Sequence, residues 1–125
     1  MIKRIHHAHI PIPPGAEPAA REFYCGVLGL AEVQKPEILR GNPGFWMQLG
    51  DQQIHVGPDP NPQPPNSPAH VAYEVSDLAQ WKTALAAQGC TFKDSETIPG
   101  YIRAETRDPF GNRIEFLQST ANREA

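Results

Sequence analysis

An internal repeat constrains the fold of this chain more than any other feature of its sequence. The segment His7–Ile12 (HAHIPI) aligns with His70–Val75 (HVAYEV) in the second half of the chain. Further along each half, Ile54–Val56 (IHV) aligns with Ile114–Phe116 (IEF). Each first segment precedes a predicted helix, and each last segment follows a predicted turn. The sequence therefore predicts two modules of the same architecture within 125 residues.

Hydrophobic periodicity gives the same order of elements in both halves. In the first half it predicts a helix over 18–28 and strands over 5–12, 30–33, 45–49 and 52–57. In the second half it predicts a helix over 77–88 and strands over 69–75, 91–92, 101–107 and 113–117. Each half therefore reads strand, helix, strand, strand, strand. Ser76 or Asp77 can cap the second helix, and glycines at 29 and 89 can end the two helices.

A proline-rich segment separates the two halves. Residues 58–68 (PDPNPQPPNSP) contain six prolines, so this stretch can neither continue a helix nor pair as a central strand. We interpret it as a stiff, extended connector. The predicted organisation is thus module one at 1–57, the connector at 58–68, module two at 69–118 and a polar tail at 119–125.

Strand alternation places four metal-capable side chains on the face turned away from the helices. Ile54 and Val56 face the helix, so His55 between them faces the other way, and the equivalent strands follow the same pattern. The four residues are His7, His55, His70 and Glu115. If the halves pack about a pseudo-two-fold axis, these side chains converge on it. Four candidates at repeat-related positions favour a metal site over ordinary packed histidines.

The segments HAHIPI, AAREFYCGVLGL, HVAYEV and DPFGNRIEF resemble the vicinal-oxygen-chelate superfamily. This superfamily includes glyoxalase I, fosfomycin- and bleomycin-resistance proteins, methylmalonyl-CoA epimerase and extradiol dioxygenases. The resemblance covers nearly the whole chain and is more specific for the fold than for the reaction. It implies an α+β fold of two βαβββ modules, each forming a half-barrel sheet with its helix outside, and a metal held inside the combined cavity.

The resemblance also implies a ligand set, because such proteins take their ligands from the first and fourth strands of each module. Carried onto this sequence, the ligands are His7, His55, His70 and Glu115. His55 departs from the Glu of bacterial glyoxalase I and the Gln of the epimerase, and the fosfomycin proteins have no ligand there. Whether His55 binds is therefore left open. Three imidazoles and one carboxylate suit a single divalent ion, which could be Zn, Ni, Co, Fe or Mn.

The expected function follows from this donor set. We expect a metal-dependent glyoxalase-like lyase or isomerase whose small substrate chelates the ion through neighbouring oxygens. By resemblance to glyoxalases Glu115 is the candidate base, with Glu74 as the second candidate, and the candidate substrate-binding residues are His9, Trp46 and Arg103. The alternatives are a bleomycin-resistance-like binding protein without catalysis and a fosfomycin-type thiol transferase. If His55 does not bind, the remaining two-His-one-carboxylate set suits a non-haem iron dioxygenase.

Charge and composition limit the classes of partner that the chain is expected to bind. The formal net charge is −3 and no block of Lys or Arg stands out, so neither nucleic acid nor an anionic membrane surface is an expected partner. No apolar run approaches the length of a membrane span, and we expect a cytoplasmic protein. Cys25 and Cys90 are expected to be free thiols. The resemblance implies a homodimer, with the cavity either within one chain or shared across the interface.

Overall fold

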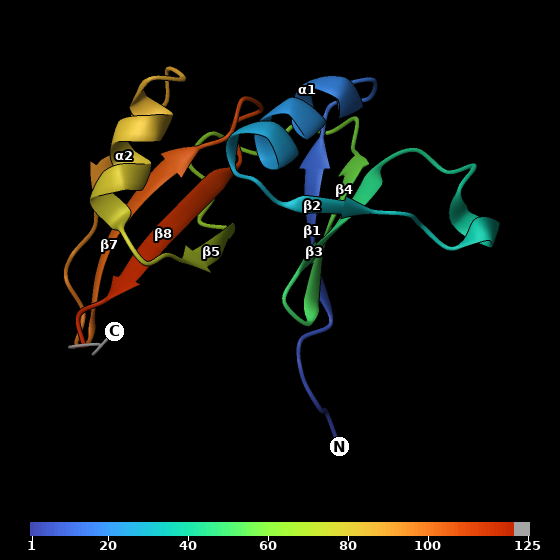
Figure 1. The fold of residues 1–125 in the computed structure, drawn as a ribbon. Helices are drawn as coiled ribbons and strands as arrows, with labels where there is room; N and C mark the ends of the chain where they lie inside the picture. Colours follow the sequence, from blue (N-terminus) through green and yellow to red (C-terminus); the bar gives the residue numbers. More distant parts are fainter. Residues whose placement is uncertain (122–125) are drawn as a thin grey trace. The chain divides into compact units, whose positions relative to one another are not determined.

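The computed structural model describes residues 1–121. The chain divides into two compact units between Pro64 and Pro65, within the proline-rich segment. Module one contains a four-stranded sheet and a helix (Figure 1). Its elements are β1 (His7–Ile12), α1 (Glu17–Arg21), the π-helical turn η1 (Glu22–Val27), β2 (Ala31–Val33), the 3-10 turn η2 (Glu37–Leu39), β3 (Phe45–Leu49) and β4 (Gln52–Pro58).

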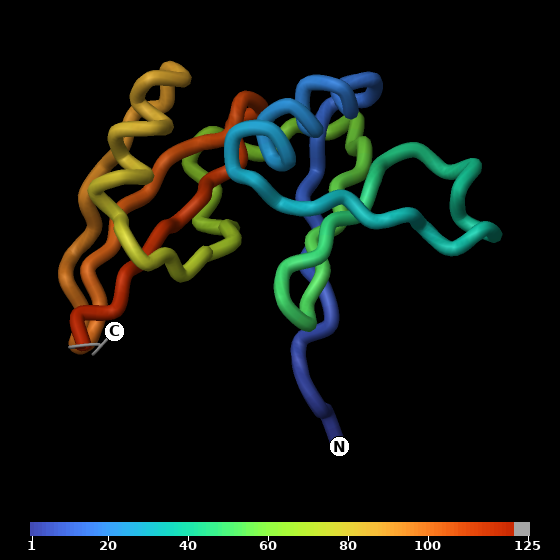
Figure 2. Tube along the Cα trace, in the orientation of Figure 1, coloured from blue at the N-terminus to red at the C-terminus, as the bar shows by residue number. Residues whose placement is uncertain are grey.

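Module two repeats this order. Its elements are β5 (His70–Glu74), α2 (Leu78–Ala86), β6 (Lys93–Asp94), β7 (Tyr101–Arg107) and β8 (Arg113–Ser119). The strand orders are β1-β4-β3-β2 and β5-β8-β7-β6, so the first strand of each module lies at a sheet edge beside the fourth. That pair is parallel in both modules and the remaining pairs are antiparallel. The Cα trace in Figure 2 shows β1 and β4 side by side. The predicted α+β fold of two βαβββ modules is confirmed.

Several element boundaries differ from the sequence prediction by one or two residues, and two of these differences change how a segment is interpreted. The short strand of module two pairs at Lys93–Asp94, whereas it was expected to begin at Thr91 and Phe92. Phe92 instead packs its ring near Phe116, with centroids 6.0 Å apart, so its apolar character reflects core packing and not strand pairing. The last strand continues to Ser119, opposite Tyr101, into the segment expected to be a polar tail. The rest of that segment, 122–125, lies outside the described residues.

The core of module one lies between its helix and one face of its sheet. Apolar residues of β1, β3 and β4 alternate with polar ones, and the buried set comprises Ile10, Ile12, Phe23, Tyr24, Phe45, Met47, Ile54 and Val56. The wider helical turn at η1, with the Leu28 N–H bonded to the Phe23 carbonyl at 2.9 Å, brings the last part of the helix over this face. Gly29 then adopts a φ of 79° and ends the helix as predicted.

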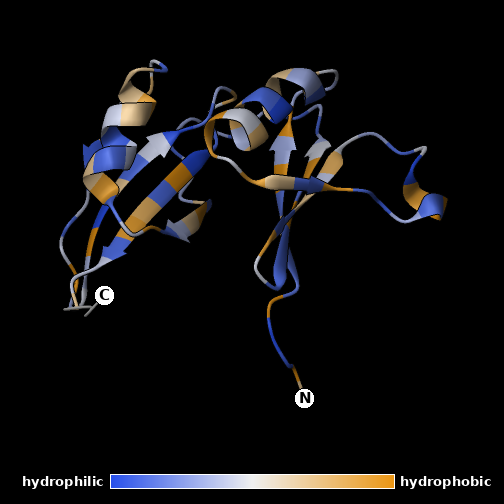
Figure 3. Ribbon diagram, in the orientation of Figure 1, coloured by the Kyte–Doolittle hydropathy of each residue, from blue (hydrophilic) through white to orange (hydrophobic). Residues whose placement is uncertain are grey.

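The core of module two has the same arrangement. The Asp77 side chain accepts a hydrogen bond of 3.0 Å from the Gln80 N–H and caps α2, so of the two predicted caps, Ser76 and Asp77, the second is the one used. Trp81 of α2 stacks on Phe116 of β8 with ring centroids 5.7 Å apart, so the helix covers the face that carries Phe116. Figure 3 shows hydrophilic and hydrophobic residues alternating along β8. In each module the opposite sheet face is therefore left for polar side chains.

None of the helices in residues 1–121 combines the length and the apolar character that crossing a membrane requires.

Candidate functional site

Module one brings His7 and His55 together on the sheet face turned away from its helix. Strand β1 runs parallel to β4 with His7 opposite Gln53, and His55 follows two residues later on the same face. The two imidazoles stack with ring centroids 4.0 Å apart. On its other side His55 stacks on Trp46 of β3, also at 4.0 Å and with the ring planes 1° apart. His55 is therefore the middle ring in a stack of three.

Hydrogen bonding and burial define the state of His55. Gln53 donates through Nε2 to Gln48 Oε1 at 3.0 Å, so its own Oε1 is the acceptor that lies 2.8 Å from His55 Nε2. This assigns the ring proton to Nε2 and the lone pair to Nδ1. Burial, followed by repulsion from the neighbouring histidines, lowers the pKa of His55 to about 4. The ring is consequently neutral at pH 7, the form in which imidazole binds a metal.

Module two brings His70 and Glu115 together at the equivalent positions. Strand β5 runs parallel to β8 with His70 opposite Arg113, and Glu115 follows two residues later. His70 Nε2 lies 3.1 Å from Glu115 Oε1, while His70 Nδ1 donates to the Pro68 carbonyl at 2.7 Å. Metal-binding histidines usually hold one ring nitrogen against a carbonyl or carboxylate in this way and present the other to the ion.

Charged side chains surround Glu115 on the same face. Glu115 itself is 6% exposed. The Nη1 atom of Arg103, on β7, lies 3.5 Å from Oε2 of Glu115. The Nε of Arg103 donates to the Glu96 carbonyl at 2.8 Å, which fixes the guanidinium beside the carboxylate. Glu105 lies opposite Glu115 in the β7–β8 pair and forms a 2.9 Å ion pair with Arg113. Module two thus carries an ionic cluster where module one carries stacked rings.

The three candidate substrate-binding residues all lie on these polar faces. Trp46 stacks on His55, and Arg103 lies beside Glu115. His9 is exposed and occupies the space above Gly57, where a Cβ would lie 2.8 Å from its Cε1. Contact between these side chains and a substrate stays a prediction.

Sequence reasoning missed four residues that shape the two faces: Gln53, Gly57, Glu105 and Arg113. The first two lie two residues on either side of His55, so the strand alternation that selected His55 also marked them. Arg113 stands two residues before Glu115 in the same way. Glu105 could not be found like this, because its place opposite Glu115 depends on how β7 and β8 are paired.

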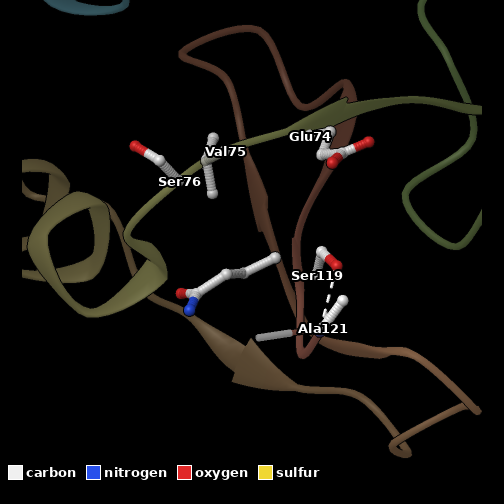
Figure 4. Close-up of a pocket in the computed structure, with 6 residues that line it drawn as sticks. Glu74, Val75, Ser76, Ser119 and Ala121 are labelled. Carbon is white, nitrogen blue, oxygen red and sulfur yellow. Dashed lines mark hydrogen bonds between the residues drawn. The ribbon is translucent and has the colours of Figure 1, made fainter. Parts of the chain in front are cut away.

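The four predicted metal donors lie in two pairs, one pair in each module. Among residues 1–121, no three or more His, Cys, Asp or Glu side chains form a group that could hold a metal ion. A common centre for His7, His55, His70 and Glu115 therefore stays a prediction. A cavity of about 480 Å³ at the ends of β5 and β8 contains none of the four (Figure 4). Its lining residues are Glu74, Val75, Ser76, Gln118, Ser119 and Ala121.

Comparison with known families decides what these paired modules are. Residues 4–116 match the model of the Glyoxalase/Bleomycin resistance protein/Dioxygenase superfamily. The chain belongs to this superfamily. The resemblance seen in the sequence is confirmed, and superfamily members commonly bind a metal. Neutral His55, the oriented His70 ring and the buried Glu115 carboxylate have the donor chemistry for such an ion.

Solved structures in the superfamily share the fold over nearly the full length. A glyoxalase-family protein of Bacillus anthracis is 38% identical, with 96% of this chain and 98% of that chain covered and a TM-score of 0.86. A glyoxalase/dioxygenase of Nostoc punctiforme is 17% identical, with 95% and 92% covered and a TM-score of 0.80. A lactoylglutathione lyase of Agrobacterium tumefaciens is 20% identical, with 94% and 95% covered and a TM-score of 0.70. The latter two show the fold alone. No curated protein sequence matches the chain.

Proposed function

We propose that this superfamily member is a metal-dependent lyase or isomerase of the glyoxalase type, acting on a small substrate that chelates the ion through neighbouring oxygens. One observation carries the proposal: the modules pair their first and fourth strands equivalently, and each places a donor pair there. The pairs are His7 with His55 and His70 with Glu115. The proposed ion is one of Zn, Ni, Co, Fe or Mn. When bound, it would polarise the substrate oxygens and stabilise the negative charge that develops on them.

The neighbours of these donors support the ligand assignment. The Pro68 carbonyl orients His70, and the flanking rings of His7 and Trp46 restrict the His55 ring. Because the imidazoles already have defined orientations, little side-chain freedom is lost when they bind the metal ion. His55 is already neutral at pH 7, so it can bind the metal ion without first releasing a proton.

Glu115 is the proposed general base. Its carboxylate has two oxygens with different neighbours, since Oε1 faces His70 and Oε2 faces Arg103. In the proposed reaction one oxygen takes a proton from the carbon next to a substrate carbonyl and returns it to the adjacent carbon. Arg103, tied to the Glu96 carbonyl, orients the carboxylate for this transfer. Trp46 and His9 are proposed to contact the substrate from the module-one face.

Metal content and turnover, measured on the same preparations, test this function. Wild type and Glu115→Gln are loaded with Zn, Ni, Co, Fe or Mn in separate samples and assayed with the methylglyoxal–glutathione hemithioacetal and related α-oxygenated carbonyl compounds. We expect turnover that depends on the ion and falls at least about a hundredfold in Glu115→Gln. Glu37→Gln, an exposed carboxylate of module one, is the matched control and keeps wild-type turnover.

Two results would contradict the proposed function. One is a wild-type protein that gains no turnover with any of the ions. The other is equal turnover in Glu115→Gln and Glu37→Gln. Tight binding of small molecules without metal and without turnover would instead support the bleomycin-resistance type of binding protein.

A further inference from the structure

A second cavity lies in module one, beside the edge strand β2 of its sheet. Its volume is about 330 Å³, and β2, the loop of residues 34–44 and the start of β3 form its walls. Phe45 lines it and directly precedes Trp46, so these two side chains leave opposite faces of the sheet. The Arg21 guanidinium lies over the Phe45 ring, 4.7 Å from its centroid. Neither His7 and His55 nor Trp46, which stacks on His55, is among the residues that line this cavity.

The cavity wall carries uncompensated positive charge. Of its charged side chains, Arg21 and Glu32 neutralise each other in an ion pair of 3.0 Å. Lys35 and Arg40 have no carboxylate within ion-pair distance anywhere in residues 1–121. Glu37, on the same loop, does not line the cavity. Two positive charges thus remain on one wall of a chain whose net charge is −3.

The loop fixes both of these cations through its own backbone. Lys35 donates through Nζ to the Asn42 carbonyl, and Arg40 donates through Nε to the Lys35 carbonyl at 3.0 Å. Each side chain donates one hydrogen bond to the loop. Both terminal nitrogens of Arg40 and the other ammonium hydrogens of Lys35 therefore remain to donate to a ligand. The planar fork of a guanidinium matches the two oxygens of a carboxylate.

The remaining walls define what else a ligand must carry. Val33 and Phe45 give the cavity an apolar side, opposite in character to Lys35 and Arg40. Its volume is near the lower end of the roughly 300–1,000 Å³ that is usual for small-molecule sites. We propose that this cavity binds a small organic carboxylate, with the carboxylate on Arg40 and Lys35 and the apolar part against Phe45 and Val33. Because none of the four proposed metal donors lines this cavity, we take this ligand to be an addition to any substrate bound at the histidines.

Titration of the full-length, isotopically labelled protein tests the proposal without any activity readout. The probes are benzoate, its neutral counterpart benzamide and inorganic phosphate, each followed by NMR of the backbone amides and the arginine Nε–H groups. We expect saturable shifts with benzoate, centred on the Arg40 Nε–H and the amides of residues 34–45. Benzamide should give none, and phosphate should bind at least about tenfold more weakly. Shifts centred elsewhere, or equal binding of benzoate and either other probe, would overturn the proposal.

Charge-removing variants assign the binding to the two cations. Arg40→Gln alters an exposed side chain and is expected to weaken benzoate binding by about tenfold, as is usual for losing a charge-assisted hydrogen bond. Lys3→Gln removes the same charge from an exposed position outside the cavity and is expected to leave the affinity unchanged. Lys35→Gln provides a second, independent variant. Equal weakening in Arg40→Gln and Lys3→Gln would show that only net charge matters and would overturn the site.

Discussion

Modules one and two share strand order and register, yet their polar faces are held together by different forces. On module one, Trp46, His55 and His7 form a stack of rings, and the middle ring is neutral. On module two, Glu115 lies between His70 and Arg103 in a cluster of charged groups. The backbone therefore determines where a donor pair lies, and the neighbouring side chains determine its charge.

The difference has a direct physical consequence. Ring stacking in module one depends on shape and contact area, which salt hardly changes. Ion pairs in module two depend on charge, are weakened by dissolved salt and contribute little where they are exposed. Module one should thus respond most to the loss of a ring or to acid, and module two to the loss of a charge.

Removing the Trp46 ring should have the largest effect on module one. Trp46→Ala takes away one side of the stack on His55 and leaves a half-buried gap, so we expect the free energy of unfolding to fall by about 2–3 kcal/mol. Urea unfolding followed by circular dichroism measures it. Trp46→Phe keeps a ring on His55 and should recover most of the loss. An unchanged stability in Trp46→Ala would remove stacking as the organising force.

Acid should destabilise metal-free module one through His55. The pKa of His55 in the folded state is about 4, below its ordinary value of 6.5, so between these values the unfolded chain binds a proton that the folded chain does not. Stability is therefore complete above pH 6.5 and falls as the pH drops toward 4. By pH 5 we expect a loss of about 1–2 kcal/mol.

Tryptophan fluorescence can follow this acid effect in each module. Trp81→Phe leaves Trp46 to report on module one, and Trp46→Phe leaves Trp81 to report on module two. His55→Gln is the control, since it should remove this part of the pH dependence. The same slope with and without His55 would contradict the account.

Removing the Arg103 charge should have a smaller effect, confined to module two. Arg103→Gln takes one partner from the buried Glu115 carboxylate but leaves His70 beside it, so we expect a loss of about 1 kcal/mol. The difference from wild type should shrink in 1 M salt, because screening weakens the ion pair. A loss that is independent of salt would indicate packing and not charge.

The smallest effect is expected at Gly57. In Gly57→Ala the added Cβ meets the end of the His9 ring, and His9 is exposed and free to rotate away. Gly57 is buried, but the nearest atoms to the new Cβ belong to this movable ring, and alanine restricts the unfolded chain more than glycine does, so we expect a change in stability of no more than about 0.5 kcal/mol. The NMR signals of the His9 ring should nevertheless shift. A loss as large as that of Trp46→Ala would show that His9 is packed more firmly than described.

The sequence could predict the parts of this molecule that depend on local rules. Alternation placed Ile54 and Val56 against the helix, and capping chemistry limited the start of α2 to Ser76 or Asp77. Contacts between strands could not be predicted, because they depend on register. Trp46 lies directly opposite His55, whereas Arg103 lies opposite Leu117 and reaches Glu115 diagonally across the antiparallel pair. For the same reason the apolar Phe92 was mistaken for a strand residue, although it packs on Phe116.

We propose that the donor pairs of the two modules bind one metal ion together. Titration of the metal-free chain with Co²⁺ tests this proposal, with binding followed by the visible absorption of the bound ion and by calorimetry. We predict one ion per chain, and the loss of that same site in both His7→Ala and His70→Ala. A second independent ion, or wild-type affinity after either substitution, would contradict it.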